Sequence, residues 1–395
     1  MKIAPYYQKL LAKGVQAIKS GEPISFVGMY DSGETYLFSI LAPLVQTEVS
    51  KDQIVASVDI SGLGDEKKIT KSIISAIAES VNLKQKAENF SELTNIISGI
   101  ARKTRITLSF NLGIDVNKGE NFYLMINRLR NLCGWNFSYL FFANTSLITQ
   151  DITQGAILEK LVRRNIVPIK LPSEPDSEVV ISNYEERYGR ELYKNTRAKI
   201  MELSGGNPGL IKALFIQASE NEEWKEANLW DERLYFRLSR IYSDLTLEYQ
   251  EKLKSIVEGK VVDDEKTISF FRSFDFINEK NEIFSPMFMK YLLNFDELQI
   301  ENNEQLGEVA NTLFSRSERV IVEYLTAHEG EIVDRDQMAK IIWGENWADK
   351  YSDWAIDQLM HGIREKLKTV AGVGVIKTKK GEGFIYQAGK EKNEK

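Results

Sequence analysis

The chain has 395 residues, of which 43% are hydrophobic and 27% are charged, and its formal net charge is −6. This composition is typical of folded domains and excludes a largely disordered chain, while the length predicts more than one domain. The negative charge argues against a protein that binds nucleic acid over its whole surface, so any DNA contact needs a local basic patch. The single cysteine, Cys133, excludes an internal disulfide and a thiolate zinc site.

The N-terminal residues 1–20 alternate lysines with apolar residues, which predicts a short amphipathic helix. They contain neither the apolar core nor the small-residue cleavage site of a signal peptide. No apolar run in the chain approaches the ~20 residues that a membrane-spanning helix needs. We therefore expect a cytoplasmic protein that has no membrane partner.

Residues 21–171 alternate between short apolar runs and longer amphipathic stretches. The expected strands are 24–27, 54–60, 106–110, 139–143 and 166–170. The expected helices between them are 34–45, 66–81, 90–103 and 122–133. Strands that alternate with helices predict an α/β domain with a parallel sheet and helices on both faces.

The first expected strand leads into a loop with the spacing of a phosphate-binding loop, G-x-x-x-x-G-x-[ST]. Its residues are Gly28, Gly33 and Thr35, and a helix is expected to follow. Glu34 stands where such a loop has the lysine that contacts the β- and γ-phosphates. A carboxylate ~4 Å from a phosphate costs about 4 kcal/mol at an effective dielectric of 20. We therefore expect triphosphate binding to be several orders of magnitude weaker than in an intact loop.

The strand at 106–110 is followed by Asn111 and Leu112, where a hydrolysing ATPase needs an acidic pair for Mg²⁺ and water. Asp115 is the alternative, displaced carboxylate. Asn144 follows the strand at 139–143, and the family resemblance described below implies a polar sensor residue there. We expect no catalytic residue, no metal site, no cofactor and no ATP hydrolysis, and weak binding of ATP or ADP without turnover stays open.

Residues 172–242 predict a helical lid. It includes the run Ser204-Gly205-Gly206-Asn207-Pro208-Gly209, in which Asn207 can cap a helix that has Pro208 at its first position. With the loop described above, this run resembles the STAND and Orc/Cdc6-like AAA+ ATPases over residues 23–216. In that family the proline of a Gly-x-Pro motif packs near the adenine. The resemblance implies a degenerate P-loop NTPase-like module with the nucleotide-site residues Gly28, Gly33, Glu34, Thr35, Asn111, Asn144 and Pro208.

Residues 243–296 show a helical pattern at 247–257, an apolar segment at 268–274, a short hairpin at 276–284 and a closing helix at 287–293. This order resembles the small winged helix that follows the lid in STAND ATPases, and its acidic surface favours a packing role. Residues 297–311 are charged and predict a linker. Residues 389–395 predict a disordered polar tail.

Residues 312–388 predict a second winged helix. Three expected helices, at 319–325, 334–343 and 352–368, precede β-prone runs at 375–377 and 384–386. The third helix has an apolar stripe at a 3.6-residue period, formed by Ile356, Met360, Ile363 and Leu367. A long helix followed by a basic hairpin is typical of a protein that places the helix in the major groove and the hairpin on phosphates.

This segment resembles the DNA-binding effector domain of OmpR/PhoB-type transcription regulators. The matching runs are Ile341-Ile342-Trp343-Gly344, Ala355-Ile356-Asp357, Ile363-Arg364-Glu365-Lys366-Leu367 and Ile376-Lys377-Thr378-Lys379-Lys380-Gly381-Glu382-Gly383-Phe384. The resemblance implies double-stranded DNA as the partner. The family usually has arginines at the positions of His361 and Gly362, which we expect on the outer face of the third helix.

The candidate DNA contacts lie on the outer face of the third helix and on the hairpin. Gln358 can pair with adenine through two hydrogen bonds, whereas the basic side chains can contact phosphates. Asp357 and Glu365 add negative charge near them. The full set of candidates is Trp354, Gln358, His361, Arg364, Lys366, Lys377, Lys379 and Lys380.

Together these patterns predict a DNA-binding transcriptional regulator whose winged helix is controlled by a catalytically degenerate STAND-like module. One alternative is an active or nucleotide-sensing NTPase switch, in which another cation replaces the missing lysine. Its local candidates are Lys67, Lys68, Arg102 and Arg105. The other alternative is a scaffold that contacts protein partners through the NTPase-like module and binds no DNA.

Overall fold

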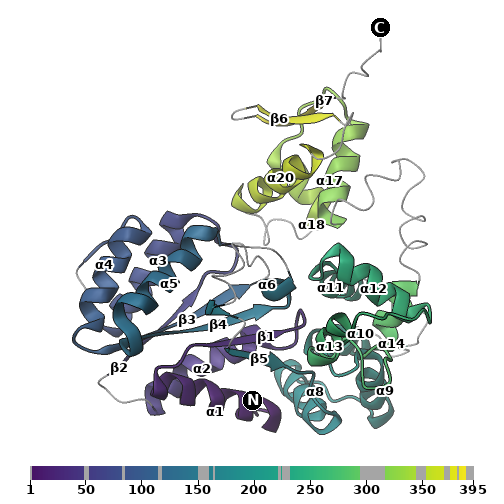
Figure 1. The fold of residues 1–395 in the computed structure, drawn as a ribbon. Coiled ribbons are helices and arrows are strands. Elements are labelled where there is room, and N and C mark those ends of the chain that lie inside the picture. The colour runs from purple at the N-terminus through teal and green to yellow at the C-terminus, as the bar shows by residue number, and fades with distance from the viewer. Residues whose placement is uncertain are drawn as a thin grey trace. The chain divides into compact units, whose positions relative to one another are not determined.

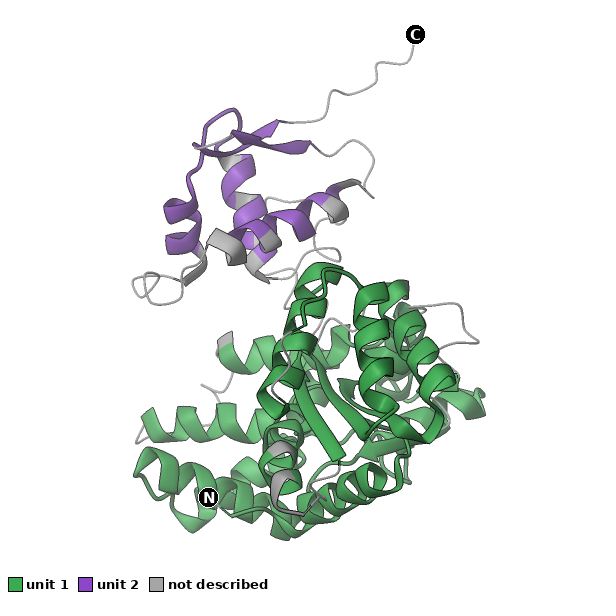
Figure 2. Ribbon diagram, turned by 90° about the vertical axis from the view of Figure 1, so that its left-hand side faces the viewer, with its two compact units in different colours: residues 1–293 green, residues 294–395 purple. Residues whose placement is uncertain are grey.

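The described residues of the computed structural model belong to two compact units, residues 1–293 and 294–395 (Figure 2). The predicted linker at 297–311 and the predicted tail at 389–395 lie outside the described residues. The described ranges are 2–48, 53–81, 85–113, 118–149, 160–162, 165–220, 224, 232–293, 316–343, 353–368, 374–379 and 382–387.

The first unit begins with the predicted amphipathic helix, α1 (Pro5–Ser20). Its Tyr7 and Leu11 are buried in a core that also includes residues of the next helix and of the sheet. Pro5 is tolerated in the first turn because the N–H groups there have no partner within the helix. The helix ends at Gly21, whose φ of 72° is a left-handed conformation that glycine adopts without steric cost.

A five-stranded parallel sheet forms the centre of the first unit (Figure 1). Its strand order is β2-β3-β4-β1-β5, and every neighbouring pair is parallel. Because the strands are parallel, all their carboxyl ends lie at one edge, and the loop after β1 leaves that edge from an interior strand. The strands are β1 (Ile24–Gly28), β2 (Gln53–Asp59), β3 (Arg105–Gly113), β4 (Phe137–Asn144) and β5 (Ile166–Ile169).

Helices cover both faces of this sheet (Figure 1). On one face, α1 and α2 (Glu34–Glu48) bury Phe26 and Phe142, whose rings stack with centroids 5.0 Å apart. On the other face, Phe141 meets Phe122 of α5. The helices of that face are α3 (Glu66–Ser80), α4 (Phe90–Ala101) and α5 (Glu120–Cys133). Phe141 and Phe142 are neighbours in β4 and lie on opposite faces of the sheet, as successive residues of a strand do.

The helical lid and the small module complete the first unit. The lid contains α8 (Glu174–Tyr188), α9 (Lys194–Ser204), α10 (Pro208–Glu220) and α11 (Glu232–Ser243). In the small module, an antiparallel bridge between Ile277 and Ile283 forms the predicted short hairpin. Its helices are α12 (Leu247–Val257), α13 (Glu265–Ser273) and α14 (Pro286–Leu293).

The second unit is a winged helix with its own core. Ile356, Met360, Ile363 and Leu367, the predicted stripe, are all buried in that core. The elements are α17 (Arg316–Ala327), α18 (Arg335–Trp343), α20 (Asp353–Lys368), β6 (Val375–Lys379) and β7 (Gly383–Gln387). Strands β6 and β7 pair in antiparallel fashion and form the wing.

The fold class predicted from the sequence is confirmed: an α/β parallel sheet, a helical lid, a small winged helix and a C-terminal winged helix. Several boundaries differ by one to three residues, and β3, for example, continues through Asn111 and Leu112 to Gly113 rather than ending at residue 110. A register shift between Asn111 and Gly113 lets the strand continue past the expected end. Among the described residues, no helix has both the length and the apolar content that crossing a membrane requires.

Candidate nucleotide site and nucleic-acid interface

The loop between β1 and α2 is a tight turn, and steric contacts require glycine at two of its positions. A Cβ atom on Gly28 would lie 2.0 Å from Ser32 Oγ. Gly33 has a φ of 111°, and a Cβ atom there would lie 2.5 Å from the Tyr7 hydroxyl oxygen. That hydroxyl donates a hydrogen bond of 2.8 Å to the carbonyl oxygen of Ser32. Contacts with the protein itself therefore require both glycines, whether or not a phosphate binds.

Glu34, the first residue of α2, turns its carboxyl group into this loop. The side chain is buried, and its Oε2 accepts a hydrogen bond of 3.1 Å from the backbone N–H of Gly33. Burial, followed by the negative charge of Asp31, raises the pKa of Glu34 from 4.5 to about 8. The backbone N–H groups at a helix N-terminus bind anions, and here one of them is used by the protein's own carboxyl group.

The raised pKa changes one expectation for Glu34. The expected repulsion of a phosphate requires an ionised Glu34 carboxylate, whereas a group with a pKa of about 8 is mostly protonated at neutral pH. Direct charge repulsion of a phosphate is therefore smaller than expected. The missing lysine and the occupied Gly33 N–H remain as obstacles to phosphate binding.

The lid contacts the loop directly. Asp31, with a φ of 62°, forms an ion pair with Arg237 of α11. The backbone N–H of Gly209 donates to the carbonyl oxygen of Asp31 at 3.3 Å, and the Asn207 amide donates to that of Tyr30 at 3.1 Å. Burial raises the pKa of Asp31, and Arg237 opposes this shift. Three kinds of protein contact thus connect the lid and the loop.

Pro208 occupies the position predicted for it at the start of a helix. It is the first residue of α10, and Asn207 caps that helix by accepting the N–H of Leu210 at 3.0 Å. Because Gly209 follows immediately and contacts the loop, Pro208 lies beside the loop. Thr35, by contrast, is exposed.

The two predicted asparagines are buried at the carboxyl ends of β3 and β4. The Asn111 amide donates to Asp59 Oδ1 at 3.2 Å. Asn144 Oδ1 accepts the Ser146 hydroxyl at 2.5 Å. Leu112 is fully buried, so it offers no polar group to water or metal. Asp115, the alternative carboxylate, lies outside the described residues.

Asp59, Asp244 and Arg237 belong to this site, but sequence reasoning did not select them. Asp244, at the end of α11, accepts the Thr145 hydroxyl at 2.6 Å. Burial raises its pKa to about 6, against the lowering effect of its hydrogen bonds. The position of Asp59 at the end of an expected strand was the available signal for it. Asp244 and Arg237 come from a helix distant in sequence, which gives no such signal.

Three of the four cations considered as replacements for the lysine are placed unfavourably. Arg105 begins β3, at the edge of the sheet opposite the loop, and donates to the carbonyl oxygen of Lys19 at 2.7 Å. Arg102 follows α4, which leads into the same edge. Lys67 pairs with Glu88 at 2.6 Å on the surface. The structure therefore brings Arg237, rather than these residues, to the loop.

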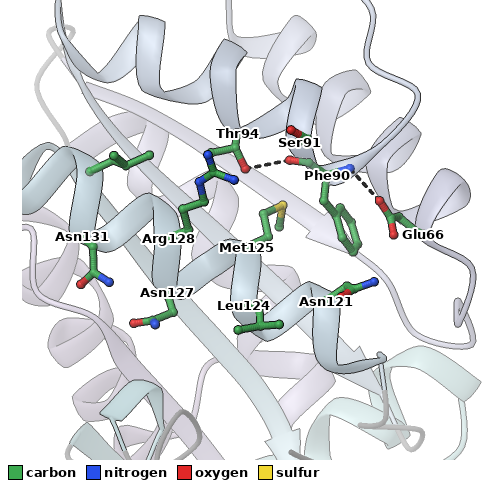
Figure 3. Close-up of a pocket in the computed structure, with 11 residues that line it drawn as sticks. Glu66, Phe90, Ser91, Thr94, Asn121, Leu124, Met125, Asn127, Arg128 and Asn131 are labelled. Atoms are coloured by element: carbon green, nitrogen blue, oxygen red, sulfur yellow. Dashed lines mark hydrogen bonds between the residues drawn. The ribbon is translucent and has the colours of Figure 1, made fainter.

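A separate pocket of about 490 Å³ lies between α4 and α5 (Figure 3). Phe90 and Met125 form part of its wall, and Arg128 also lines it. Glu66 accepts the N–H of Phe90 at 2.9 Å, and the Thr94 hydroxyl donates to the Phe90 carbonyl oxygen at 2.7 Å. No residue of either predicted site lines this pocket.

The recognition helix of the second unit is α20. His361 is exposed on it, as predicted. Gly362 is half-buried, and a Cβ atom there would lie 3.0 Å from Oε1 of Glu318 in α17. The position that we expected on the outer face is thus only partly open to solvent, because the Glu318 side chain lies beside it.

The wing presents basic side chains. Lys377 and Lys379 of β6 are exposed, whereas Ile376, which precedes them, is buried. Lys380 lies outside the described residues, and so do the side chains of Trp354, Gln358 and Lys366.

Arg364 is partly buried, unlike the lysines of the wing. Its Nε donates to the Ile376 carbonyl oxygen at 2.9 Å, and its Nη2 donates to Thr378 Oγ1 at 2.6 Å. The structure therefore brings together Arg364 and the wing, and leaves His361, Lys377 and Lys379 open to solvent.

Comparison with known proteins identifies the second unit. Residues 310–386 match the family model described as "Transcriptional regulatory protein, C terminal", which confirms the predicted OmpR/PhoB-type domain. A search of curated proteins finds no match to the chain.

Several solved structures are similar to the chain. A Walker-type ATPase of Pyrococcus abyssi has 11% identity and a TM-score of 0.49, over 73% of this chain and 94% of that one. The Orc1 protein of Aeropyrum pernix in complex with DNA has 10% identity and a TM-score of 0.45, over 98% and 90%. DnaA from Aquifex aeolicus bound to AMPPCP has 13% identity and a TM-score of 0.38, over 76% and 90%.

Proposed function

We propose that this protein is a DNA-binding transcriptional regulator that reads double-stranded DNA with its C-terminal winged helix. The family match of residues 310–386 carries this proposal. Three exposed side chains support it: Lys377 and Lys379 on the wing, and His361 on α20. None of them is part of the buried core of this unit, so all three are accessible to a ligand. A recognition helix in the major groove and a basic wing on phosphates are the expected mode of binding.

The first unit, in this proposal, is a degenerate nucleotide-binding module that controls the winged helix without hydrolysing ATP. Glu34 stands in the place of the phosphate lysine, and its carboxyl group accepts a hydrogen bond from Gly33 inside the loop. Asn111 and Leu112 offer no carboxylate to position Mg²⁺ and water. The contacts of Asp31 with Arg237 and Gly209 support a lid that closes on the loop through protein groups.

Salt-dependent DNA binding tests the regulator proposal. The fragment 312–395 includes the core of the second unit, and we expect it to bind duplex DNA with an affinity that falls as salt rises. Each phosphate contact releases counterions and contributes about 0.9 to the slope of log affinity against log salt. A folded fragment that shows no salt-dependent binding to duplex DNA of any sequence would contradict the proposal and favour the scaffold alternative.

Phosphate release tests the absence of turnover. We expect the full chain with ATP and Mg²⁺ to release phosphate no faster than the buffer does. Steady release that disappears in Glu34→Ala would contradict this proposal and favour the NTPase switch. Calorimetric titration with ATP and ADP, with and without Mg²⁺, then shows whether a nucleotide binds without turnover.

A further inference from the structure

Arg364 reaches from the recognition helix to the wing. It lies on α20, and its guanidinium group donates two hydrogen bonds to β6. One goes from Nε to the carbonyl oxygen of Ile376 at 2.9 Å, and the other from Nη2 to Thr378 Oγ1 at 2.6 Å. Two hydrogen-bond donors of the fork are thus directed at the protein's own wing.

The same guanidinium group packs on the ring of Phe384 in β7. Its Cζ atom lies 5.5 Å from the ring centroid, and Cζ of Arg335 lies 5.1 Å from the same centroid. Arg335, on α18, pairs with Asp357 of α20 at 2.8 Å. Because Phe384 is buried, both cations contact a ring that water does not reach. Phe384 is therefore the point at which α18, α20 and the wing meet.

Backbone contacts hold the other side of the wing. Val333, which precedes α18, exchanges two hydrogen bonds of 2.9 Å with Phe384. These contacts fix β7, while Arg364 connects β6 to α20. Arg364 thus connects α20 to both strands of the wing, by hydrogen bonds to β6 and by packing on Phe384 of β7, while Val333 holds β7 from the segment before α18.

We propose that Arg364 is a positioning residue that sets the wing against the recognition helix, and that it does not bind a DNA phosphate. This inference rests on the proposed function, because the wing angle matters for a surface that must fit groove and backbone together. A protein that holds its contacts in the bound geometry loses less entropy on binding. The phosphate contacts are then made by exposed wing residues such as Lys377 and Lys379.

The salt dependence of DNA binding separates positioning from phosphate contact. In the full chain, Arg364→Gln is expected to weaken binding roughly tenfold, since hydrogen bonds from a charged group are lost, and to leave the salt slope unchanged. Lys377→Gln is the matched control: it removes the same charge from the exposed wing and is expected to lower the slope by about one unit. A drop of about one unit in Arg364→Gln overturns the proposal, whatever the other measurements show.

Two further variants keep the test informative if Arg364→Gln folds poorly. Arg364→Lys retains the charge but lacks the planar fork, so positioning predicts weakened binding, whereas a phosphate contact predicts nearly unchanged binding. Thr378→Val removes one acceptor without changing any charge. It is expected to reproduce part of the Arg364→Gln effect and to add little to it in the double variant. Wild-type affinity in Arg364→Lys, or full additivity in the double variant, overturns the proposal.

Hydrogen exchange of the wing gives a measurement that does not need DNA. Amide groups of β6 are expected to exchange faster in Arg364→Gln than in the wild type, and at the wild-type rate in Lys377→Gln. If the chain binds no DNA, the proposed function fails, and this exchange still tests whether Arg364 holds the wing. Unchanged exchange in Arg364→Gln overturns the positioning role.

Discussion

The loop after β1 and the wing of the second unit are both glycine-containing turns, and they treat their charged residues in opposite ways. In the loop, Glu34 is 8% exposed and accepts a hydrogen bond from a backbone N–H beside it. In the wing, Lys377 and Lys379 are exposed to solvent. The loop thus uses a backbone N–H group on a carboxyl group of the protein, whereas the wing leaves its lysines exposed.

The difference indicates that the backbone turn of a motif and its ligand-binding chemistry depend on different residues. Gly28 and Gly33 are needed because Ser32 and Tyr7 pack against them, so the turn has a purpose within the fold itself. The chemistry depends on single side chains, and Glu34 stands where a phosphate-binding loop has its lysine. A glycine pattern alone therefore predicts the turn far better than it predicts a ligand.

Replacing Glu34 with lysine is expected to have the largest effect on this difference between the loop and the wing. We expect Glu34→Lys to tighten ATP binding by about 10³-fold, because an ammonium ~4 Å from a phosphate is worth about 4 kcal/mol at an effective dielectric of 20. Asp31 and Asp244 both raise the pKa of Glu34 by their charge, and the same charges would favour a lysine in its place. Isothermal calorimetry with ATP and Mg²⁺ measures the change.

Glu34→Gln is the control for this experiment, since it removes the titratable group without adding a cation. We expect a small effect on ATP binding from Glu34→Gln and no phosphate release from either variant. Equal ATP affinity in Glu34→Lys and Glu34→Gln would mean that the loop is closed to phosphate for another reason.

The burial of Glu34 also predicts a pH dependence of stability. Its pKa in the folded chain, about 8, is above its ordinary value of 4.5, so between these values the folded state holds more protons than the unfolded state. Stability therefore falls as pH rises, by up to about 1.4 kcal/mol per pH unit. Asp244, with a pKa of about 6, acts in the same direction at lower pH. We expect the loss between pH 6.5 and 8 to be smaller in Glu34→Gln.

Urea unfolding of residues 1–293, one of the two compact units, measures this stability at several pH values. Glu202→Gln, on the exposed surface of α9, serves as the control and should follow the wild type. Identical pH profiles for the wild type and Glu34→Gln would show that the carboxyl group is solvated in solution.

The fold was predictable because its signals are periodic and local. The strand pattern predicted every strand of the sheet, and the stripe Ile356–Leu367 predicted the buried face of α20. The glycine-bounded turn predicted the loop after β1, and the Asn207 cap predicted the start of α10. Each of these features depends on residues within a few positions of one another in the chain.

The site was predictable only in part because its contacts join distant segments. Arg237 and Asp31 are far apart in sequence, and no local pattern indicates that they form an ion pair. Similarly, the sequence shows Arg364 as one more basic residue, while the structure directs it to the wing. The raised pKa of Glu34 was missed because the burial of its side chain cannot be read from a motif. Tertiary contact, rather than residue type, decides these roles.

Sequence discrimination by the recognition helix is a smaller expected effect. If Gln358 pairs with adenine through two hydrogen bonds, Gln358→Ala should reduce discrimination between DNA sequences by about 1–3 kcal/mol. Affinity for non-specific DNA should change little, since no charge is lost. Competition binding with a selected site and a scrambled duplex measures the difference, and an equal loss on both duplexes would exclude a base-reading role.

The smallest effect is expected from the tip of the wing. Replacing Lys379 and Lys380 with alanine removes two cations, and each phosphate contact contributes close to one unit to the slope of log affinity against log salt. We therefore expect the slope to decrease by up to ~2 units and binding to weaken about equally for all sequences. The measurement is a salt titration of DNA affinity for the fragment 312–395. An unchanged slope in the double alanine variant would show that these lysines are solvent-exposed but do not contact phosphates. The loop and the wing would then no longer differ in whether their charged residues are available to a ligand.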